Sequence, residues 1–472
     1  MSVSSPPWRQ APAWLIAALA VLVAGLLGWP LWRAGLVVHF DLQEGWVAGY
    51  ALESAQGGPL YPGPERLATN NYPPLHFILV GWPGVWLGDP IRFGRFAAIA
   101  ALLALAVEVA AIVRLLGGGR MAAALAALAL IGTIAKSATA YVGMNDPQLV
   151  AHALVMAGVA AVLAARARLW PVLLGVALMI LAGFFKHNIL AIPAATMLWL
   201  LVRRRGQFAP AAACALGLGA LGVASCVAAF GPDFLRNLDL PRDYSVGRLL
   251  RNLGVLQAIA PALILWPLVR RRLARDEATD FIDFAFAASL LLFLVLRLGE
   301  GIRINALFEA MIMGSIALGL AFERIAALDL FGRKAPAALR AIVAGAVLLR
   351  LALVPSGEAM RVWFDPAFRA ALRTQEAATL EDIAWLRAHP GPLFCESLSL
   401  CVWAGRRIDY DPNTVGLRLP AGVIDGTAVN AQLGAIGFAA AQTHPTTRFD
   451  AIVAGFARAR ESVNGVFWEP AR

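Results

Sequence analysis

Eleven mostly apolar stretches, each near the length that crosses a bilayer, run through the first 355 residues of the chain. A membrane-spanning helix needs about 20 such residues. The hydrophobic share of the whole sequence, 60%, exceeds what soluble domains normally contain. We therefore expect a mainly α-helical, polytopic membrane bundle of about 11 spans. The stretches lie near residues 13–32, 94–115, 121–142, 147–165, 170–185, 188–202, 209–230, 250–269, 281–298, 304–325 and 338–354.

The first stretch follows a short basic segment, as the apolar part of a secretory signal peptide does. It ends in Trp29-Pro30-Leu31-Trp32 and has no small-residue cleavage site there. We expect it to be retained as the first span, with the N-terminus in the cytoplasm.

The apolar stretch at 75–88 is shorter than the others, and Pro83 and Gly84 interrupt it. If it does not cross the bilayer, every dense basic cluster lies in a cytoplasmic loop, as the positive-inside rule requires. We therefore expect an interfacial helix on the outer face. The net charge of +10 then reflects topology, and we expect no nucleic-acid site. The clusters contain Arg114 and Arg120, Arg166 and Arg168, Arg203 to Arg205, Arg270 to Arg272 with Arg275, and Arg333, Lys334 and Arg340.

This topology places two long segments outside the cytoplasm, residues 33–93 and the region after residue 355. The latter is more polar, with a helical pattern near 366–389 followed by the strand-like stretches PLFCES and FDAIVA. We expect a transmembrane domain at 1–355 and a small extracytoplasmic α/β domain at 356–472. Cys395 and Cys401 can form a disulfide in such a compartment, but their spacing alone does not decide it.

Two acids, Asp41 and Glu44, follow the first span directly. Partial desolvation at a membrane surface raises the basicity of a carboxylate, which suits a general base. Asp41 also precedes a helix expected to begin near Leu42, and aspartate is a favoured N-cap. Both roles are open at this stage.

Further polar residues gather at the outer ends of the expected spans. Ionisable groups at this depth are functional candidates by default, because charge is costly in a membrane. Lys186 can hold a phosphate, whereas snorkelling to the interface is the alternative for Lys136 and Lys186. Helix caps, chain corners and a structural ion-pair cluster are the alternatives for the others. The candidates are Lys136, Lys186, Asp146, Arg303, Asn71, Tyr72, His76, Asn145, His187, Asn188, Asn305 and Glu309.

The order of these features resembles the GT-C superfamily of integral-membrane glycosyltransferases, in particular bacterial members similar to protein O-mannosyltransferases and aminoarabinose transferases. Family members often have adjacent Asp-Glu where this chain has Asp41-Leu42. The likeness rests on Asp41 with Glu44, the GGPLYP turn at 57–62, Tyr72-Pro73-Pro74-Leu75, Asn145-Asp146, Lys186, and Arg303-Ile304-Asn305 leading to Glu309.

The resemblance implies an enzyme that transfers a sugar from a polyprenyl-phosphate-linked donor to a glycan, glycolipid or protein acceptor. It implies the periplasmic face of a bacterial inner membrane, and one displacement predicts inversion. Asp41, or Glu44 in its place, is the implied base, and Asp146 is a second acid. Lys186, Arg303 and Lys136 are the implied phosphate ligands, and the other candidates bind substrate.

A polytopic transporter or lipid flippase is the rival interpretation of the same charges. It predicts charged groups through the whole membrane depth and a repeat symmetry. The cysteine and histidine spacing indicates no metal site, so we expect no required cofactor and leave dependence on a divalent metal open.

Overall fold

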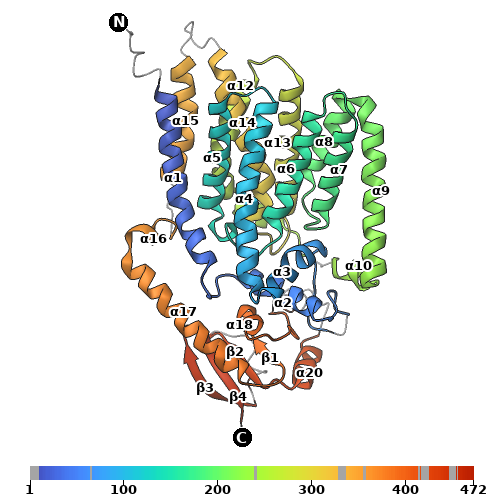
Figure 1. Ribbon diagram of the computed structural model, residues 1–472, viewed down its shortest axis with the longest axis vertical. Helices are drawn as coiled ribbons and strands as arrows, with labels where there is room; N and C mark the ends of the chain where they lie inside the picture. The colour runs from blue at the N-terminus through green and yellow to red at the C-terminus, as the bar shows by residue number, and fades with distance from the viewer. Residues whose placement is uncertain are drawn as a thin grey trace.

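The computed structural model describes residues 10–63, 66–238, 242–327, 336–353, 358–412, 415, 425–445, 453 and 455–471. Long helices stand side by side in one bundle, and a smaller part with a sheet lies against one end of it (Figure 1). The first helix, α1, begins at the opposite end of the bundle from this sheet. The expected mainly α-helical class is confirmed.

Eight helical segments among the described residues are long and apolar enough to cross a membrane, and the chain is a multi-pass membrane protein. Three other expected spans are helices of only 17, 14 and 13 residues, shorter than a spanning helix normally is. These three are α6 (Gln148–Ala164), α7 (Trp170–Gly183) and α8 (Ala191–Arg203). The eight are α1 (Ala11–Ala34), α4 (Pro90–Leu115), α5 (Arg120–Ser137), α9 (Arg205–Phe230), the run Val246–Arg270, α13 (Glu277–Leu296), the run Ile304–Arg324 and α15 (Pro336–Leu353).

Two of these segments are compound. The run Val246–Arg270 comprises α11 (Val246–Asn252), η4 (Leu253–Ile259) and α12 (Ala260–Arg270). The run Ile304–Arg324 comprises η5 (Ile304–Leu307) and α14 (Phe308–Arg324). The second run begins with the 3₁₀ turn η5, which lines the site described below, whereas η4 lies in the middle of the first run.

The core of the bundle is α14, in which every residue from Phe308 to Phe322 is buried. Close approach to its neighbour depends on Gly319, because a Cβ there would lie 2.9 Å from the carbonyl oxygen of Ala122 in α5. Helix α9 is the opposite case, with Leu216 and Leu221 exposed. Exposed leucines suit a helix that faces lipid, whereas small residues suit contacts between helices in a membrane.

The stretch at 75–88 forms η2 (Phe77–Gly81) and α3 (Trp82–Trp86). Ten helical residues extend about 15 Å, which is half the thickness of the hydrocarbon core. α3 lies beside α2 (Leu42–Ala55) at the end of the bundle that faces the sheet (Figure 1). Trp86 is exposed, and tryptophan is enriched where membranes meet water. This arrangement agrees with the expected interfacial helix.

The C-terminal part contains α16 (Arg361–Phe364), α17 (Pro366–Arg387), α18 (Leu398–Trp403) and α20 (Gly426–Ile436) around one sheet. Its strands are β1 (Leu393–Cys395), β2 (Ala440–Thr443), β3 (Phe456–Ser462) and β4 (Gly465–Pro470), in the order β1-β2-β4-β3. β1 and β2 are parallel, and the other pairs are antiparallel. The expected boundary at 355–356 lies outside the described residues, so the domain division stays a prediction. PLFCES contains β1, and FDAIVA lies largely outside the described residues.

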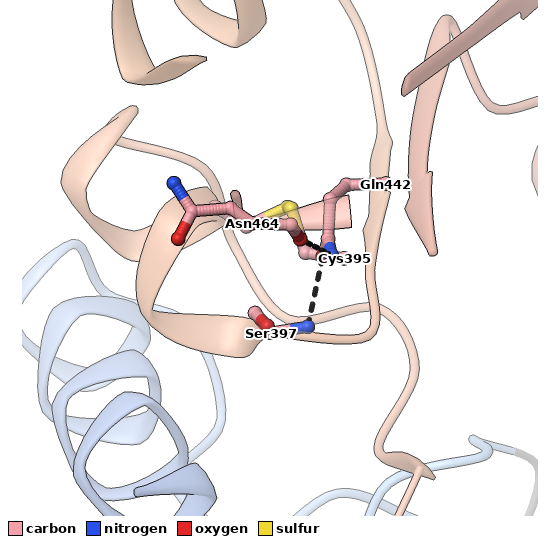
Figure 2. Close-up of a disulfide and its surroundings, with 5 residues drawn as sticks. Cys395, Ser397, Gln442 and Asn464 are labelled. Atoms are coloured by element: carbon pink, nitrogen blue, oxygen red, sulfur yellow. Dashed lines mark hydrogen bonds between the residues drawn. A yellow bond between two sulfur atoms is a disulfide. The ribbon is translucent and has the colours of Figure 1, made fainter. Parts of the chain in front are cut away.

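A disulfide joins Cys395 and Cys401, with their Cα atoms 5.9 Å apart. It ties the end of β1 to α18, and Gln442 of β2 reinforces the same turn (Figure 2). The side chain of Gln442 accepts a hydrogen bond from the Ser397 N–H and donates one to the carbonyl oxygen of Asn464. The fold therefore fixes α18 from two sides.

Helix α18 packs on α2 through two glycines one turn apart. A Cβ on Gly45 would clash with the backbone of Leu398 and Ser399, and one on Gly49 would clash with the side chain of Ile408. Residues four apart share a helix face, so the two glycines leave one face of α2 without side chains, and the C-terminal part packs directly on that face. The helix that follows Asp41 is thereby held against this extramembrane part.

Candidate active site

A cavity of about 540 Å³ lies where the start of α2 meets loops and helix ends on the side of the bundle that faces the sheet. Its walls come from five separate loop regions, the start of α2, η3 (Thr139–Tyr141), η5 and the ends of α10 (Asp233–Leu238) and α13. The lining residues are His39, Phe40, Asp41, Leu42, Gln43, Trp46, Asn71, Tyr72, Tyr141, Lys186, His187, Asn188, Leu238, Arg242, Leu296, Gly301, Ile302, Arg303, Asn305 and Ala306.

Asp41 has two sets of partners at the edge of the cavity. As the N-cap of α2, it accepts a hydrogen bond from the Gln43 N–H at 3.0 Å. Arg303 also binds it in bidentate fashion, with Nη1 3.0 Å from Oδ1 and Nη2 2.7 Å from Oδ2. Asp41 therefore caps α2, as the sequence suggested, and its side chain also lines the cavity.

Burial alone would raise the pKa of Asp41, but hydrogen bonds from Arg303 and the Gln43 N–H outweigh it and lower this pKa. Conversely, the hydrogen bond to Asp41 raises the pKa of Arg303. The expectation of raised basicity is wrong for this arrangement, because the sequence did not reveal the guanidinium beside the carboxylate. Asp41 can gain basicity only when Arg303 moves away.

Lys186 reaches the cavity from the turn after α7. Its Nζ lies 3.1 and 3.3 Å from the two carboxylate oxygens of Asp146 and 3.0 Å from the Tyr72 hydroxyl. Lys186 and Asp146 are both buried, and Asp146 also accepts the Gln148 N–H at 2.7 Å. Asp146 does not line the cavity. It positions Lys186 and neutralises its charge, so the predicted second acid acts through Lys186 in this geometry.

Glu44 lies outside the cavity, in a buried ion pair with Arg95 of α4. Arg95 Nε and Nη2 each lie 2.8 Å from a carboxylate oxygen of Glu44. The same guanidinium donates to the carbonyl oxygens of Leu36 and Val38 at 2.7 and 2.9 Å. Both side chains are buried, so the alternative that placed Glu44 as the base is wrong in this geometry.

Four other predicted site residues also lie outside the cavity. His76 Nε2 contacts Asn145 Oδ1 at 3.2 Å, and Asn145 in turn donates its N–H to Glu44. Glu309 accepts the Ile192 N–H at 2.8 Å near the start of α8. Lys136 lies in the last turn of α5. The side chains of His76, Asn145 and Glu309 form hydrogen bonds within the protein and do not line the cavity.

The cavity does gather eight of the predicted residues from four regions of the chain. Asn305 is tied to the wall by its Nδ2, which donates to Gln148 Oε1 at 3.0 Å. The eight are Asp41, Asn71, Tyr72, Lys186, His187, Asn188, Arg303 and Asn305.

Arg242, His39, Trp46 and Tyr141 are cavity residues that sequence reasoning missed. Arg242 follows α10 (Asp233–Leu238) and donates from Nη1 to the carbonyl oxygen of Glu300 at 2.7 Å. The sequence did offer one indication, because Arg242 lies in a loop predicted to be extracytoplasmic, where the positive-inside rule disfavours arginine.

The cationic groups Lys186, Arg242 and Arg303 dominate the electrostatics of the cavity. Lys186 and Arg303 are paired with carboxylates, whereas Arg242 forms no ion pair with a carboxylate of the described residues. This surplus of positive charge suits an anionic ligand such as a phosphate. Within the described part of the chain, no group of three His, Cys, Asp or Glu side chains is arranged to hold a metal ion.

The Asp41–Arg303 pair makes the stability of the fold depend on pH. A carboxylate with a lowered folded pKa stabilises the fold above its unfolded pKa of about 4, and this contribution is lost as pH falls through the folded pKa. Removing Arg303 leaves Asp41 partly buried, so its pKa rises.

We expect Arg303→Gln to lower the free energy of unfolding at pH 7 by about 1 kcal/mol, as loss of a partly exposed ion pair does. The melting temperature in detergent should fall accordingly. The gap to the wild type should narrow as pH falls below the unfolded pKa of about 4 and then through the lower folded pKa of Asp41, because the wild-type carboxylate is protonated only over that range. Arg236→Gln, which breaks the exposed pair with Asp233, is the control and should show little change. A gap that is constant from pH 7 to pH 3 would contradict this assignment.

Comparisons with known proteins identify the fold. No protein-family model matches the chain, and no curated protein matches it by sequence. Two crystal structures of ArnT from Cupriavidus metallidurans do match, each with a TM-score of 0.62. The apo form is 15% identical, with 97% of each chain covered. The form bound to undecaprenyl phosphate is 16% identical, covering 97% of this chain and 98% of that one.

An oligosaccharyltransferase from Archaeoglobus fulgidus, solved with a tethered acceptor peptide, matches with a TM-score of 0.51. It is 10% identical, and the match covers 97% of this chain and 74% of that one. ArnT is an aminoarabinose transferase, and both enzymes are membrane glycosyltransferases of the GT-C superfamily. The bundle and the extramembrane part described above thus have the fold of GT-C membrane glycosyltransferases.

Proposed function

We propose that this protein is a membrane glycosyltransferase that moves a sugar from a lipid-phosphate donor to an acceptor hydroxyl within the outer cavity. The observation that carries the proposal is one cavity-lining carboxylate, Asp41, in a cavity that also contains Lys186, Arg242 and Arg303. A displacement of this kind needs one base for the acceptor and positive charge for the departing phosphate. The cavity supplies both.

The proposed donor is a polyprenyl-phosphate-linked sugar. The solved ArnT structure with undecaprenyl phosphate supports this class of lipid, since the two chains share a fold over nearly their full lengths. Lys186, Arg242 and Arg303 are the proposed phosphate ligands. Lys136 is not among them, because it does not line the cavity.

Arg303 links phosphate binding to the basicity of Asp41. An incoming phosphate competes with Asp41 for the same two guanidinium N–H groups. Once Arg303 turns to the phosphate, the burial of Asp41 is no longer offset, and the pKa of its carboxyl rises. Asp41 would thereby become a stronger base only when the donor is in place.

In the proposed reaction, Asp41 takes the proton of the acceptor hydroxyl while the acceptor oxygen bonds to the anomeric carbon. The bond from that carbon to the phosphate oxygen breaks, and the lipid phosphate leaves with the electron pair. Lys186, Arg242 and Arg303 stabilise its negative charge. Attack on the face opposite the leaving group inverts the anomeric configuration.

The proposed acceptor is a glycan, glycolipid or protein at the periplasmic face of a bacterial inner membrane. The basic clusters of the shorter loops support this orientation under the positive-inside rule. A transporter needs a polar route through the membrane. The buried, largely apolar helix α14, which continues from the cavity-lining residue Asn305 into the bundle, favours the transferase.

We expect Asp41→Asn to reduce sugar transfer by about 10² to 10⁴-fold, the range that a general base contributes. Asparagine remains a good helix N-cap, so folding should persist. Transfer of labelled sugar from a polyprenyl-phosphate donor is the readout, together with the melting temperature.

The matched control is Asp89→Asn, because Asp89 also caps a helix and pairs with an arginine, Arg92, but lies outside the cavity. This control should retain activity close to the wild type. Retention of more than a tenth of wild-type activity by folded Asp41→Asn would rule out the base assignment.

We expect Arg242→Gln to weaken donor binding about tenfold or more, as loss of a charge-assisted phosphate contact does. The measurement is the KM for the lipid-linked donor, with kcat determined in parallel. Arg248→Gln is the control, since Arg248 lies in the same segment and donates to backbone carbonyls without lining the cavity. Equal donor KM values for the two variants would exclude Arg242 from phosphate binding.

A further inference from the structure

Lys136 and Arg350 form a second cationic centre at the ends of α5 and α15 that are nearest the outer face. A Cβ on Gly132 of α5 would lie 2.5 Å from the Leu351 side chain of α15, so the helices touch there. Lys136 lies one turn beyond Gly132 on the same face of α5, and Arg350 adjoins Leu351. The contact between Gly132 and Leu351 therefore brings together the helix turns that carry the two cations.

Neither cation has an acidic partner among the residues that the structure describes. Arg350 Nε donates to the carbonyl oxygen of Gln257 at 2.7 Å. Its Nη1 is shielded from solvent and has no hydrogen-bond partner within the described ranges. Placing two uncompensated cations within apolar helices is costly, and outer-side cations also oppose the usual charge bias of membrane proteins.

A small crevice of about 10 Å³ adjoins Arg350 between α5, the run Val246–Arg270, α14 and α15, and it is too small for a lipid chain. Small and flexible side chains line most of it, including Ala258, Ala262 and Met311. Leu353 of α15 and Ile264 of α12 are exposed, and their side chains suit contact with lipid. The two cations thus lie beside exposed apolar side chains of α15 and α12.

We propose that Lys136 and Arg350 bind the phosphate of an outer-leaflet lipid whose chains lie along the exposed apolar side chains of the neighbouring helices, such as Leu353 and Ile264. The charge fits, since an anionic phosphate supplies acceptor oxygens for Lys136 and for the unpartnered Nη1 of Arg350. This site is separate from the catalytic cavity, because neither residue lines that cavity. It does not depend on the proposed transferase activity.

The test is native mass spectrometry of the full chain in detergent with added phosphatidylglycerol. Diacylglycerol with the same chains serves as the lipid without a phosphate. The wild type should retain phosphatidylglycerol, and the double variant Lys136→Gln/Arg350→Gln should bind it about 30-fold more weakly. Arg361→Gln, which removes an arginine already paired with Asp365, should bind it like the wild type.

Equal retention by the double variant, or equal retention of diacylglycerol by the wild type, would overturn the proposal. A measurement on the wild type covers the case in which the double variant does not fold. Phosphatidylglycerol should raise the melting temperature, whereas inorganic phosphate or diacylglycerol should not. No rise with phosphatidylglycerol overturns the proposal, and an equal rise with inorganic phosphate shows a free-anion site instead of a lipid site.

Discussion

The buried ion pair between Glu44 and Arg95 is the interaction on which the geometry of the outer cavity depends. It joins α2 to α4 and, through the carbonyl oxygens of Leu36 and Val38, fixes the chain between the first span and α2. Asp41 lies within this fixed segment and begins α2 as its N-cap. Removing one partner of such a buried pair typically costs about 3–5 kcal/mol, since the other charge remains buried. Glu44 therefore contributes to the site by holding it in place.

The extramembrane part completes the same site from the other side. Trp46 donates its indole N–H to the buried carboxylate of Asp411 at 3.0 Å, and His39 contacts the Ser399 hydroxyl at the same distance. Both Trp46 and His39 line the cavity. The Cys395–Cys401 disulfide and the side chain of Gln442 hold α18, which carries Ser399. These two hydrogen bonds join chain segments about 360 residues apart, so both segments contribute to one wall of the cavity.

Apolar run length predicted the helical bundle, because the thickness of a bilayer sets the length of a spanning helix, and the interfacial position of 75–88 stays a prediction. The eight predicted cavity residues lie at the outer helix ends, where that topology placed polar groups. The partner of Glu44 was not predictable, since Arg95 is 51 residues away and no local pattern connects them. The roles of Glu309 and Asn145 also depend on which backbone N–H groups packing leaves nearby. Arg242 was missed because the sequence does not show where the side chain of a loop arginine points.

The central claim is that one base and one displacement move the sugar from a lipid phosphate within this cavity. The most direct test is the anomeric configuration of the product compared with that of the polyprenyl-phosphate-linked donor, measured by proton NMR after enzymatic transfer. A single displacement assisted by Asp41 predicts inversion. Retention would require a covalent intermediate or a second displacement and would contradict the account.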